Sequence, residues 1–256
     1  MKIEINKIYN MDCLEGMKYI EDKSIDMILC DLPYGTTACK WDTIIPFKPL
    51  WEQYERIVKD NAAIILFGSQ PFTSKLVVSN IDMFKYSLVW NKSRPTYFAQ
   101  APYRFMCEHE DILIFSKGFT AQNSKNRMKY YPQGLEDTYR VEKGGGTKSN
   151  SFRPGRKPTK PFIQTKTNYP RSVFKFNNEG KTIHPTQKPV ALCEYLIKTY
   201  TNKGELVLDN CMGSGTSCVA AINTGRNYIG FELDNTYFKI ANKRIEEHKQ
   251  NININT

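Results

Sequence analysis

The sequence predicts an α/β domain built on a mostly parallel sheet, with an irregular insertion in its second half. Short apolar segments alternate with helical patterns along most of the 256 residues, which is typical of an open α/β sheet. Two of the apolar segments end in turns of the kind that binds ligands at the edge of such a sheet. From residue 117 to residue 183 the alternation stops and basic residues accumulate. These observations predict one sheet domain, residues 1–116 and 184–250, interrupted by a separate segment.

Seven apolar segments are expected to form the strands of the sheet. Each is a run of about four to eight residues between turn-forming residues, the pattern of a parallel strand covered on both faces. In chain order the expected strands are residues 7–10, 25–30, 62–67, 86–90, 111–115, 205–208 and 227–231.

Four helices are expected between and after these strands. Two of them follow from apolar faces at helical spacing, formed by Phe47, Leu50, Trp51, Tyr54, Ile57 and Val58 and by Val190, Cys193, Leu196, Ile197 and Tyr200. Pro189 suits the first helical position of the second of these helices. The other two are expected over residues 216–223, after a glycine turn, and from Asn235 to about residue 247. The tail, residues 251–256, is expected to be frayed.

The composition argues against several classes of protein. No run of 18 apolar residues exists and the N-terminus has no apolar signal-peptide core, so we expect a cytoplasmic protein without a membrane span. The seven cysteines are odd in number and scattered, without a Cys-x-x-Cys pair, which argues against a disulfide framework. Cys107 and His109 come nearest to a metal cluster, but the chain has only three histidines, and we expect no metal site.

The net charge of +10 lies in one part of the chain. Residues 117–180 contain fourteen Lys or Arg and four Asp or Glu, so the rest of the sequence is neutral. Aromatic side chains are interleaved with the basic ones, and a stretch this long without regular structure is more often functional than a plain connector. We therefore expect residues 117–183 to bind a polyanion. A solvated basic loop is the alternative.

A glycine-rich turn follows the sixth expected strand. Asp209 ends that strand, Gly213 and Gly215 permit a tight turn close to a ligand, and a helix begins at about Thr216. Glu232 ends the next strand, where a carboxylate can accept hydrogen bonds from ribose hydroxyls. The turn lacks the third glycine of a dinucleotide motif and the Gly-Lys-Ser/Thr sequence of a P-loop. The pattern indicates a nucleoside site, with a purely structural turn as the alternative.

The segment Asp31-Leu32-Pro33-Tyr34 follows the second expected strand, at the carboxyl edge where α/β sheets place ligands. An exocyclic amine of a nucleobase is a poor nucleophile because its lone pair is delocalised into the ring, so its alkylation needs acceptors for the N–H protons. Asp31 offers a carboxylate and Leu32 a carbonyl, which Pro33 aims by holding Leu32 extended. Tyr34 offers a face on which an extruded base can stack. A chance turn is the alternative for this tetrapeptide.

These segments resemble the motifs of amino-directed DNA methyltransferases. Residues 31–34 are similar to their Asp-Pro-Pro-Tyr motif, and residues 209–216 to their Asp-x-Phe-x-Gly-Ser-Gly-Thr motif for S-adenosylmethionine. Residues 184–189, His-Pro-Thr-Gln-Lys-Pro, match a segment that precedes the cofactor motif, and residues 11–15 and 229–234 resemble two further motifs. The order of catalytic motif, recognition region and cofactor motif is that of the β group. The resemblance implies a circularly permuted Rossmann-like sheet, with residues 117–183 as a target-recognition insertion.

The resemblance also implies a role for each motif residue. Asp31, Leu32, Pro33 and Tyr34 are the implied catalytic residues, which would hold a target base flipped out of the duplex. The implied contacts of S-adenosylmethionine are Asp12 near its adenine, Glu232 at its ribose, and Thr186, Lys188, Asp209, Met212, Gly213, Ser214, Gly215 and Thr216 around its methionine end. For Lys188 the alternative is a solvated lysine at a helix start, and for Asp12 it is a surface turn.

Two positions depart from the family pattern. Leu32 replaces the first proline, but its role is that of a backbone carbonyl, so activity should survive with a less rigid loop. Cys211 stands where phenylalanine is usual, which removes an aromatic contact to the cofactor and is expected to weaken its binding.

The resemblance implies site-specific methyl transfer to adenine N6 in double-stranded DNA. An acidic residue at position 31 is more frequent in adenine enzymes, and transfer to cytosine N4 is the alternative. RNA or protein amine methyltransferases have the cofactor motif first, and a DNA-binding module without activity needs neither the acidic cluster nor the glycine turn. A homodimer and a separate restriction endonuclease are open as partners, and a bacterial or phage-encoded protein is implied.

Overall fold

The structure, a computed structural model, describes residues 2–36, 42–121, 123–142, 161–178 and 187–254. Contacts within the chain divide it into two compact units. The first unit comprises residues 1–131 and 172–256, and the second unit comprises residues 132–171.

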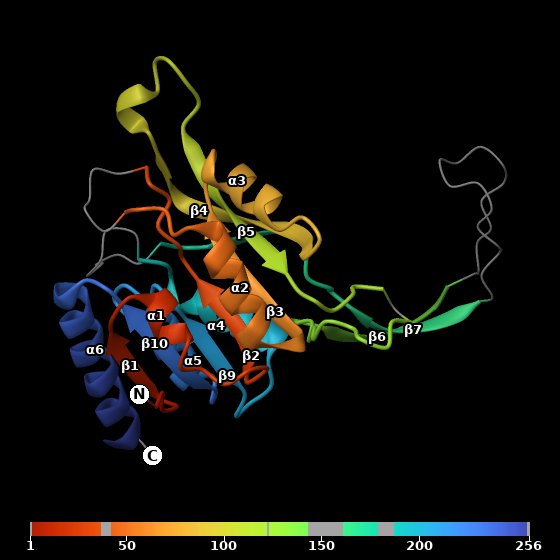
Figure 1. The fold of residues 1–256 in the computed structure, drawn as a ribbon. Coiled ribbons are helices and arrows are strands. Elements are labelled where there is room, and N and C mark those ends of the chain that lie inside the picture. Colours follow the sequence, from red (N-terminus) through yellow and green to blue (C-terminus); the bar gives the residue numbers. More distant parts are fainter. Residues whose placement is uncertain (1, 37–41, 122, 143–160, 179–186, 255–256) are drawn as a thin grey trace. The chain divides into compact units, whose positions relative to one another are not determined.

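The first unit is built on an eight-stranded sheet (Figure 1). Neighbouring strands run parallel except at β5, which is antiparallel to both β3 and β4. The amino end of β5 therefore lies at the edge where the other strands have their carboxyl ends. In spatial order the strands are β1 (Lys7–Asn10), β10 (Asn227–Glu232), β9 (Leu206–Asp209), β2 (Ile25–Cys30), β3 (Val58–Gly68), β5 (Cys107–Phe115), β4 (Phe84–Thr96) and β8 (Val173–Phe176).

Helices cover both faces of this sheet, as Figure 1 shows. One apolar core contains side chains of α1 (Cys13–Met17), α2 (Phe47–Ile57) and α3 (Phe72–Ser79). The core on the opposite face contains side chains of α4 (Val190–Tyr200), α5 (Thr216–Asn223) and α6 (Asn235–Ile254). A short 3-10 turn, η1 (Phe98–Gln100), lies in the loop between β4 and β5.

The central strands supply side chains to both cores. In β3, Ile64 and Leu66 belong to the first core, while Ile65 and Phe67 belong to the second, because successive side chains of a strand point to opposite faces. All four are buried, and full burial of such a side chain contributes about 1.5–3 kcal/mol. A strand covered on both faces therefore needs apolar residues at consecutive positions, which is the pattern that predicted these strands.

The predicted α/β class with a mostly parallel sheet is confirmed. All seven expected strands are present, although β3, β4 and β5 are longer than their apolar centres. The four expected helices are also present, with Pro189 as the N-cap of α4 rather than its first helical residue. The sequence reading missed α1 and α3, which have five and eight residues and therefore give short hydrophobic patterns. It also missed β6, β7 and β8 within residues 117–183.

The C-terminal helix is longer than expected. α6 continues to Ile254, so residues 251–254, which were expected to be frayed, are helical. Extending an existing helix adds one hydrogen bond for each residue that is fixed, so a weak tail can continue a stable helix.

The second unit contains a two-stranded antiparallel ribbon. β6 (Glu136–Glu142) pairs with β7 (Phe162–Thr167), and Nζ of Lys166 lies 2.6 Å from Oδ1 of Asp137 across the pair. Most side chains of both strands are exposed, so this unit has no apolar core of its own among its described residues.

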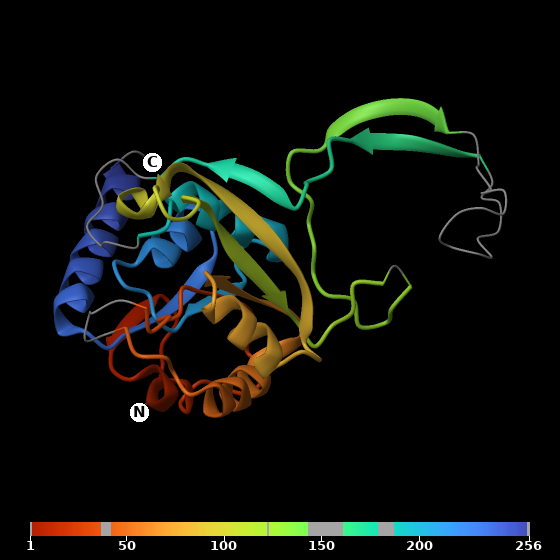
Figure 2. The same ribbon diagram turned by 90° about the horizontal axis from the view of Figure 1, so that it is seen from above.

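The second unit, residues 132–171, is shorter than the segment that the sequence predicted to be an insertion, residues 117–183. Residues 117–131 and 172–176 belong to the first unit. In Figure 2, seen from above, β8 runs along β4, to which it pairs in parallel. Trp90 of β4 donates a hydrogen bond of 2.9 Å from Nε1 to the carbonyl of Phe176. Strand β4 therefore gives residues 173–176 apolar neighbours, which the basic composition of this segment does not reveal.

No helix in the described ranges is long and apolar enough to cross a membrane. Six cysteines carry free thiols, and Cys39 lies outside the described ranges. Among the same residues, no group of three or more His, Cys, Asp or Glu is placed to hold a metal ion.

Candidate active site

A cavity of about 690 Å³ lies at the carboxyl edge of the sheet in the first unit. The segments that follow β1, β2, β9 and β10 border it, because parallel strands bring their carboxyl ends to one edge. Gly215 does not line the cavity, and Thr186 lies outside the described residues. The other predicted site residues all line it: Asp12, Asp31, Leu32, Pro33, Tyr34, Lys188, Asp209, Met212, Gly213, Ser214, Thr216 and Glu232.

Asp31, which directly follows β2, is held by two donors. The Tyr34 hydroxyl donates to Oδ1 over 2.7 Å, and Nζ of Lys188 donates to Oδ2 over 2.5 Å. A carboxylate has about four acceptor positions, so each oxygen can still accept another hydrogen bond. The side chain is 24% exposed, which leaves it within reach of a ligand in the cavity.

The electrostatic surroundings of Asp31 oppose one another. Burial raises the pKa of its carboxyl, the nearby charge of Glu110 adds to this, and the ammonium of Lys188 lowers the pKa, with a net rise. Burial also raises the pKa of the Tyr34 hydroxyl, so that group stays protonated and remains a donor to Asp31. The Tyr34 ring stacks on Phe72 at 4.8 Å between centroids.

Lys188 connects Asp31 to a second carboxylate. Its Nζ lies 3.3 Å from Oε2 of Glu110, and Nζ of Lys92 lies 3.3 Å from Oε1 of the same residue. Burial alone disfavours the ammonium of Lys188, but Asp31 and Glu110 raise its pKa above the usual value. Burial likewise opposes the charge of Glu110, yet Lys188 and Lys92 hold its pKa below the usual value. The four side chains form one charge cluster, defined here as Asp31, Lys188, Glu110 and Lys92.

Glu110 and Lys92 were not among the residues predicted from the sequence. Glu110 precedes the apolar part of β5 and reaches the carboxyl edge because this strand runs antiparallel to its neighbours. Trp90 of β4 pairs with Glu110 in the sheet register, which brings the nearby Lys92 to the same edge. The sequence does show a carboxylate just before a buried run, but a residue that precedes a parallel strand lies at the amino edge of the sheet. Only the reversed direction of β5 brings this carboxylate to the carboxyl edge.

Asp209 ends β9, the strand next to β2, and Glu232 ends β10 beyond it; uncharged groups donate hydrogen bonds to both carboxylates. Oδ1 of Asp209 accepts from the backbone N–H of Cys211 over 3.1 Å, and Oδ2 accepts from the Ser217 hydroxyl. Oε2 of Glu232 accepts from the N–H of Gly213 over 2.9 Å, and Oε1 accepts from the N–H of Asp234 over 2.8 Å. Burial raises the pKa of both carboxyls to about 6.

The glycine turn uses two left-handed backbone positions. Gly213 has a φ of 52° and Gly215 a φ of 77°, a region that side chains with a Cβ rarely adopt. Gly215 is the N-cap of α5, and a Cβ there would lie 3.1 Å from Ile245. Gly215 therefore shapes the turn behind the cavity, while Gly213 presents its N–H to Glu232 at the cavity wall.

Two further side chains support this turn. Nη1 of Arg244, from α6, donates to Oγ1 of Thr216 over 3.0 Å and to the carbonyl of Ser214 over 3.1 Å. The Ser214 hydroxyl donates to Oε1 of Gln187 over 3.1 Å. Neither Arg244 nor Gln187 was predicted as a supporting residue, because the contacts join elements far apart in the chain.

Asp12 and Cys211 have structural partners as well as places on the cavity wall. Oδ1 of Asp12 accepts from the N–H groups of Leu14 (2.8 Å) and Glu15 (3.2 Å), which caps α1. The Sγ of Cys211 lies 3.5 Å from Nδ2 of Asn210. The capping explains the position of Asp12 without a ligand, and both residues still face the cavity.

The residues present fit S-adenosylmethionine, a nucleoside that carries a cationic sulfur and an ammonium group. The cavity volume is within the usual range of small-molecule sites, about 300–1,000 Å³. Asp12, Asp209 and Glu232 supply carboxylates on its wall, which suit a cation and hydroxyl donors. The bonds seen at Asp209 and Glu232 leave each oxygen room to accept a further hydrogen bond.

A family model described as DNA methylase matches residues 25–243. Among curated proteins, the chain is 30% identical to the type II methyltransferase M1.MboII of Moraxella bovis, with 94% of this chain and 96% of that protein covered. It is 28% identical to the type II methyltransferase M.HinfI of Haemophilus influenzae, covering 97% and 70%. The DNA adenine methyltransferase YhdJ of Escherichia coli (strain K12) is also 28% identical, covering 95% and 83%.

Two solved structures illustrate the likeness in fold. The crystal structure of the M1.HpyAVI–SAM complex has a TM-score of 0.59 and 25% identity, with 93% of this chain and 98% of that chain covered. The PvuII DNA methyltransferase, described as cytosine-N4-specific, has a TM-score of 0.65, covers 98% and 93%, and is 14% identical, which shows a shared fold only.

Proposed function

The chain belongs to the family of amino-directed DNA methyltransferases, and we propose that it methylates adenine N6 at a specific site in double-stranded DNA. Asp31 at the first position of the catalytic motif, hydrogen-bonded to Tyr34 and Lys188, is the observation that carries this proposal. The name of the adenine-methylating relative YhdJ supports the choice of base. Cytosine N4 is the competing acceptor, since it is an exocyclic amine of the same kind.

S-adenosylmethionine supplies an electrophilic methyl group on a positively charged sulfur. We assign Asp209, Glu232, Asp12 and the Gly213 turn to its binding, because they line the cavity after the neighbouring strands β9, β10 and β1. We propose that they position the cofactor so that the acceptor amine can approach the methyl group in line. Orienting two reactants in this way is itself a large part of catalysis.

The catalytic motif would prepare the amine. A carboxylate oxygen of Asp31 accepts one N–H of the exocyclic amine and the carbonyl of Leu32 accepts the other, which favours a tetrahedral nitrogen with an available lone pair. Phe72 covers one face of the Tyr34 ring, so the extruded base stacks on the opposite face. The new N–C bond would form as the bond between sulfur and the methyl group breaks, so that the sulfur leaves as a neutral thioether and the positive charge passes to the nitrogen, where Asp31 stabilises it.

Proton transfer completes the reaction. The methylated amine carries one proton more than the product and releases it, and the Asp31 carboxylate is the base placed to receive it. A pKa raised by burial makes this carboxylate a better proton acceptor than an ordinary aspartate. Lys188 favours the ionised form beforehand, because the ammonium group lowers the pKa that burial raises.

We further propose that residues 117–183, which include the second unit, recognise the target site. The segment carries the whole excess positive charge of the chain. Lysine and arginine contacts to phosphates would position the protein, and a few side chains would read base edges. Affinity for DNA is then expected to fall steeply between about 50 and 200 mM salt, and an unchanged affinity over that range contradicts the assignment.

Incubation with labelled S-adenosylmethionine and separate DNA, RNA and protein substrates tests the reaction. Label in DNA is expected, and label confined to RNA or protein overturns the proposal. Sequencing of DNA modified in vivo, with detection of methylated adenine and methylated cytosine, tests the base and reveals the site. Methylcytosine without methyladenine would replace the proposed acceptor by cytosine N4.

We further propose two associations, with a second copy of the chain and, following the type II names of the relatives, with a separate restriction endonuclease. Measurement of the mass in solution tests the first. The second is tested by finding a nuclease that cleaves unmodified DNA but no longer cleaves it once this enzyme has methylated it.

A further inference from the structure

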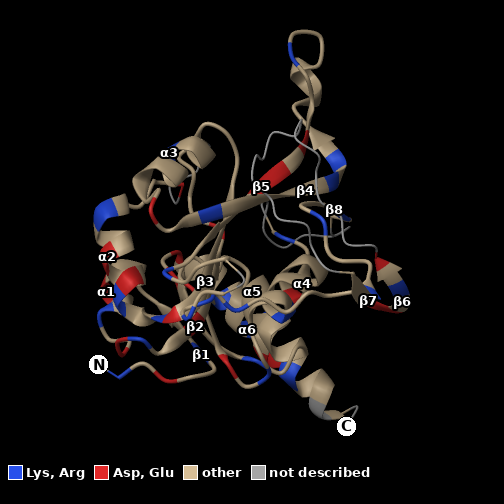
Figure 3. Cartoon of the chain, turned by 90° about the vertical axis from the view of Figure 1, so that its right-hand side faces the viewer, with Lys and Arg blue, Asp and Glu red and all other residues tan. Residues whose placement is uncertain are grey.

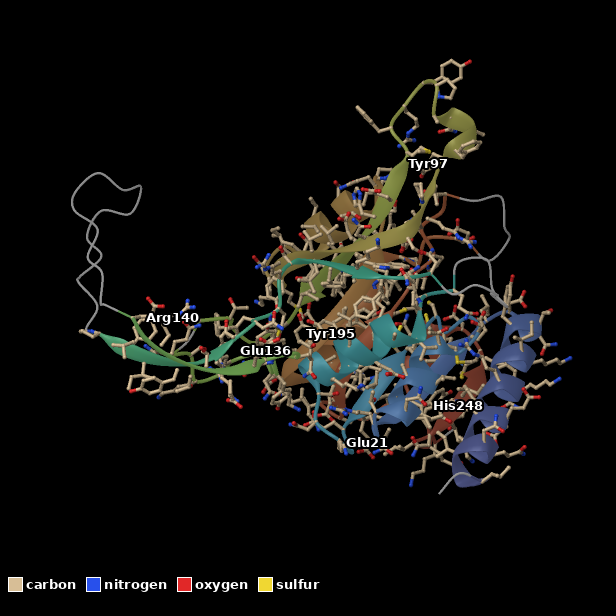
Figure 4. The ribbon with its side chains drawn as sticks, turned by 180° about the vertical axis from the view of Figure 1, so that it is seen from behind. Glu21, Tyr97, Glu136, Arg140, Tyr195 and His248 are labelled. Atoms are coloured by element: carbon tan, nitrogen blue, oxygen red, sulfur yellow. The ribbon has the colours of Figure 1, made fainter. Side chains whose placement is uncertain are left out.

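The loop between β4 and β5 exposes three large aromatic side chains. In this hairpin tip, defined as residues 97–106, Phe98 is 82% exposed, Tyr103 90% and Phe105 96%. Figure 4 shows the tip projecting beyond the sheet, with Tyr97 near its base. Isolated exposed aromatics are common, but a group of three on one short projection needs a partner to be explained.

The tip has a defined backbone conformation although its aromatics are exposed. The N–H groups of Gln100 and Arg104 bond to the carbonyls of Tyr97 (2.9 Å) and Gln100 (3.0 Å). Tyr97 adopts a left-handed φ of 67°, and the guanidinium of Arg104 lies 4.3 Å from the centre of its ring. At the base of the tip, Oγ1 of Thr96 donates to the carbonyl of Cys107 over 3.1 Å. The aromatics are therefore presented by an ordered turn.

The tip begins at the wall of the active-site cavity. Thr96, Tyr97 and Cys107 line the same cavity as Asp31. Residues 94–106 contain Arg94 and Arg104 and no acidic residue, and Figure 3 shows basic but no acidic colour on the tip. A nucleic acid that delivers a base to Asp31 must approach this wall, where it meets positive charge and aromatic faces together.

We propose that the hairpin tip is a wedge that enters the duplex beside the target base and fills the stacking space left when that base is extruded. Apolar side chains inserted between base steps stabilise unstacked DNA, and aromatic rings stack on bases regardless of sequence. Phe98, Tyr103 and Phe105 supply the rings, and the two arginines contact the flanking phosphates. The inference rests on the proposed function, because it assigns a contact for the DNA substrate of that reaction.

A second copy of this chain is the competing partner for the exposed rings. The cavity wall at the base of the tip favours DNA, since a protein partner seated there would stand in the path of the methyl acceptor. The excess of arginine over acidic residues points the same way, because phosphates supply the opposite charge.

The test compares Phe98→Ala, Tyr103→Ala and Phe105→Ala with Tyr19→Ala, an exposed aromatic of the first unit away from the cavity. Each protein is assayed on two duplexes that contain the methylation site. One has the target base paired normally, and the other has an abasic position opposite it, so the target is already unpaired. The wedge predicts that at least one tip variant loses about 10- to 100-fold in kcat/KM on the paired duplex. On the abasic duplex the loss should shrink to about threefold or less, because extrusion costs least for an unpaired base.

Three results overturn the wedge. Wild-type activity of every tip variant on the paired duplex removes the role, and so does an equal loss on both duplexes, which indicates general binding. A wild-type dimer that becomes monomeric in the tip variants, with unchanged kinetics, assigns the rings to a protein interface. If the wild-type protein methylates no DNA at all, the proposed function fails and the wedge falls with it. Methylation of cytosine leaves the test intact, because the duplexes are then built around that base.

Discussion

Two groups of carboxylates on the wall of the cavity are held in different ways; they are named here for their proposed roles, the catalytic end (Asp31 and Glu110) and the cofactor end (Asp209 and Glu232). At the catalytic end, the ammonium groups of Lys188 and Lys92 neutralise the two carboxylates. At the cofactor end, the donors seen among the described residues are N–H and O–H groups without charge. Burial raises the pKa of both carboxyls at that end to about 6, the uncharged donors offset it only in part, and the nearby charges of Asp31 at Asp209 and of Asp209 at Glu232 add to the rise.

The difference teaches how one cavity can serve two ligands. A carboxylate that already has an ammonium partner is set to act as an acceptor for a neutral amine. A buried carboxylate without a positive partner is suited to a ligand that brings its own positive charge, as S-adenosylmethionine does. We therefore expect changes at the two ends to separate catalysis from cofactor binding.

The largest effect is expected from Asp31→Ala. Loss of the acceptor and of the stabilising charge should reduce kcat by about 10²–10³-fold or more, while the affinity for S-adenosylmethionine stays within about threefold. Single-turnover transfer and calorimetric cofactor binding measure the two quantities. Asp82→Ala, at an exposed position away from the cavity, is the matched control. Unchanged turnover in Asp31→Ala refutes the role assigned to this residue.

Asp209→Asn is expected to have the opposite profile. Removal of a carboxylate that faces a cation should weaken cofactor affinity about 10- to 100-fold, the cost of about one lost charged hydrogen bond. At saturating cofactor, kcat should stay within about threefold of the wild type. A variant that binds the cofactor normally but cannot turn over would abolish the distinction between the two ends.

Cofactor affinity should depend on pH in a way that follows from the cofactor end. The pKa values of Asp209 and Glu232 are about 6, so these groups are mostly protonated at pH 5 and mostly ionised at pH 7. Because the ionised forms attract the cation, affinity should rise about tenfold per carboxylate between those values. Calorimetry across this range measures the rise, and Asp209→Asn should flatten it. An equal slope in both proteins would assign the pH dependence to other groups.

The smallest effects are expected from the charge cluster at the catalytic end. The rate depends on ionised Asp31, so activity falls as the pH drops through its pKa. Lys188→Gln removes the charge that lowers this pKa and should move the acid limb of kcat/KM to higher pH, whereas Glu110→Gln should move it to lower pH. Shifts of about half to one pH unit in opposite directions are expected. Shifts in the same direction would show that the cluster does not act on Asp31 through charge.

Much of the fold was predictable because the central strands are buried on both faces. Such strands need consecutive apolar residues, and the runs at Ile25–Cys30 and Leu206–Asp209 show this in the sequence itself. The sequence alone therefore predicts that the residues which follow them, Asp31 and the Gly213 turn, lie at one edge of the sheet. Short helices such as α1 have few buried residues, and so does strand β8 at the border of the sheet. Their sequences therefore do not show a run of consecutive apolar residues.

The sequence by itself determined the α/β class, the order of its motifs and the residues that end its parallel strands. Only the tertiary structure decided the direction of β5, which turns Glu110 toward the cavity, and the pairing of Lys188 with Asp31 across 157 positions of the chain. It likewise decided that the aromatic tip of the β4–β5 hairpin begins at the cavity wall. Burial patterns are local and remain visible in the sequence, whereas strand direction and contacts between distant residues depend on how the whole sheet closes.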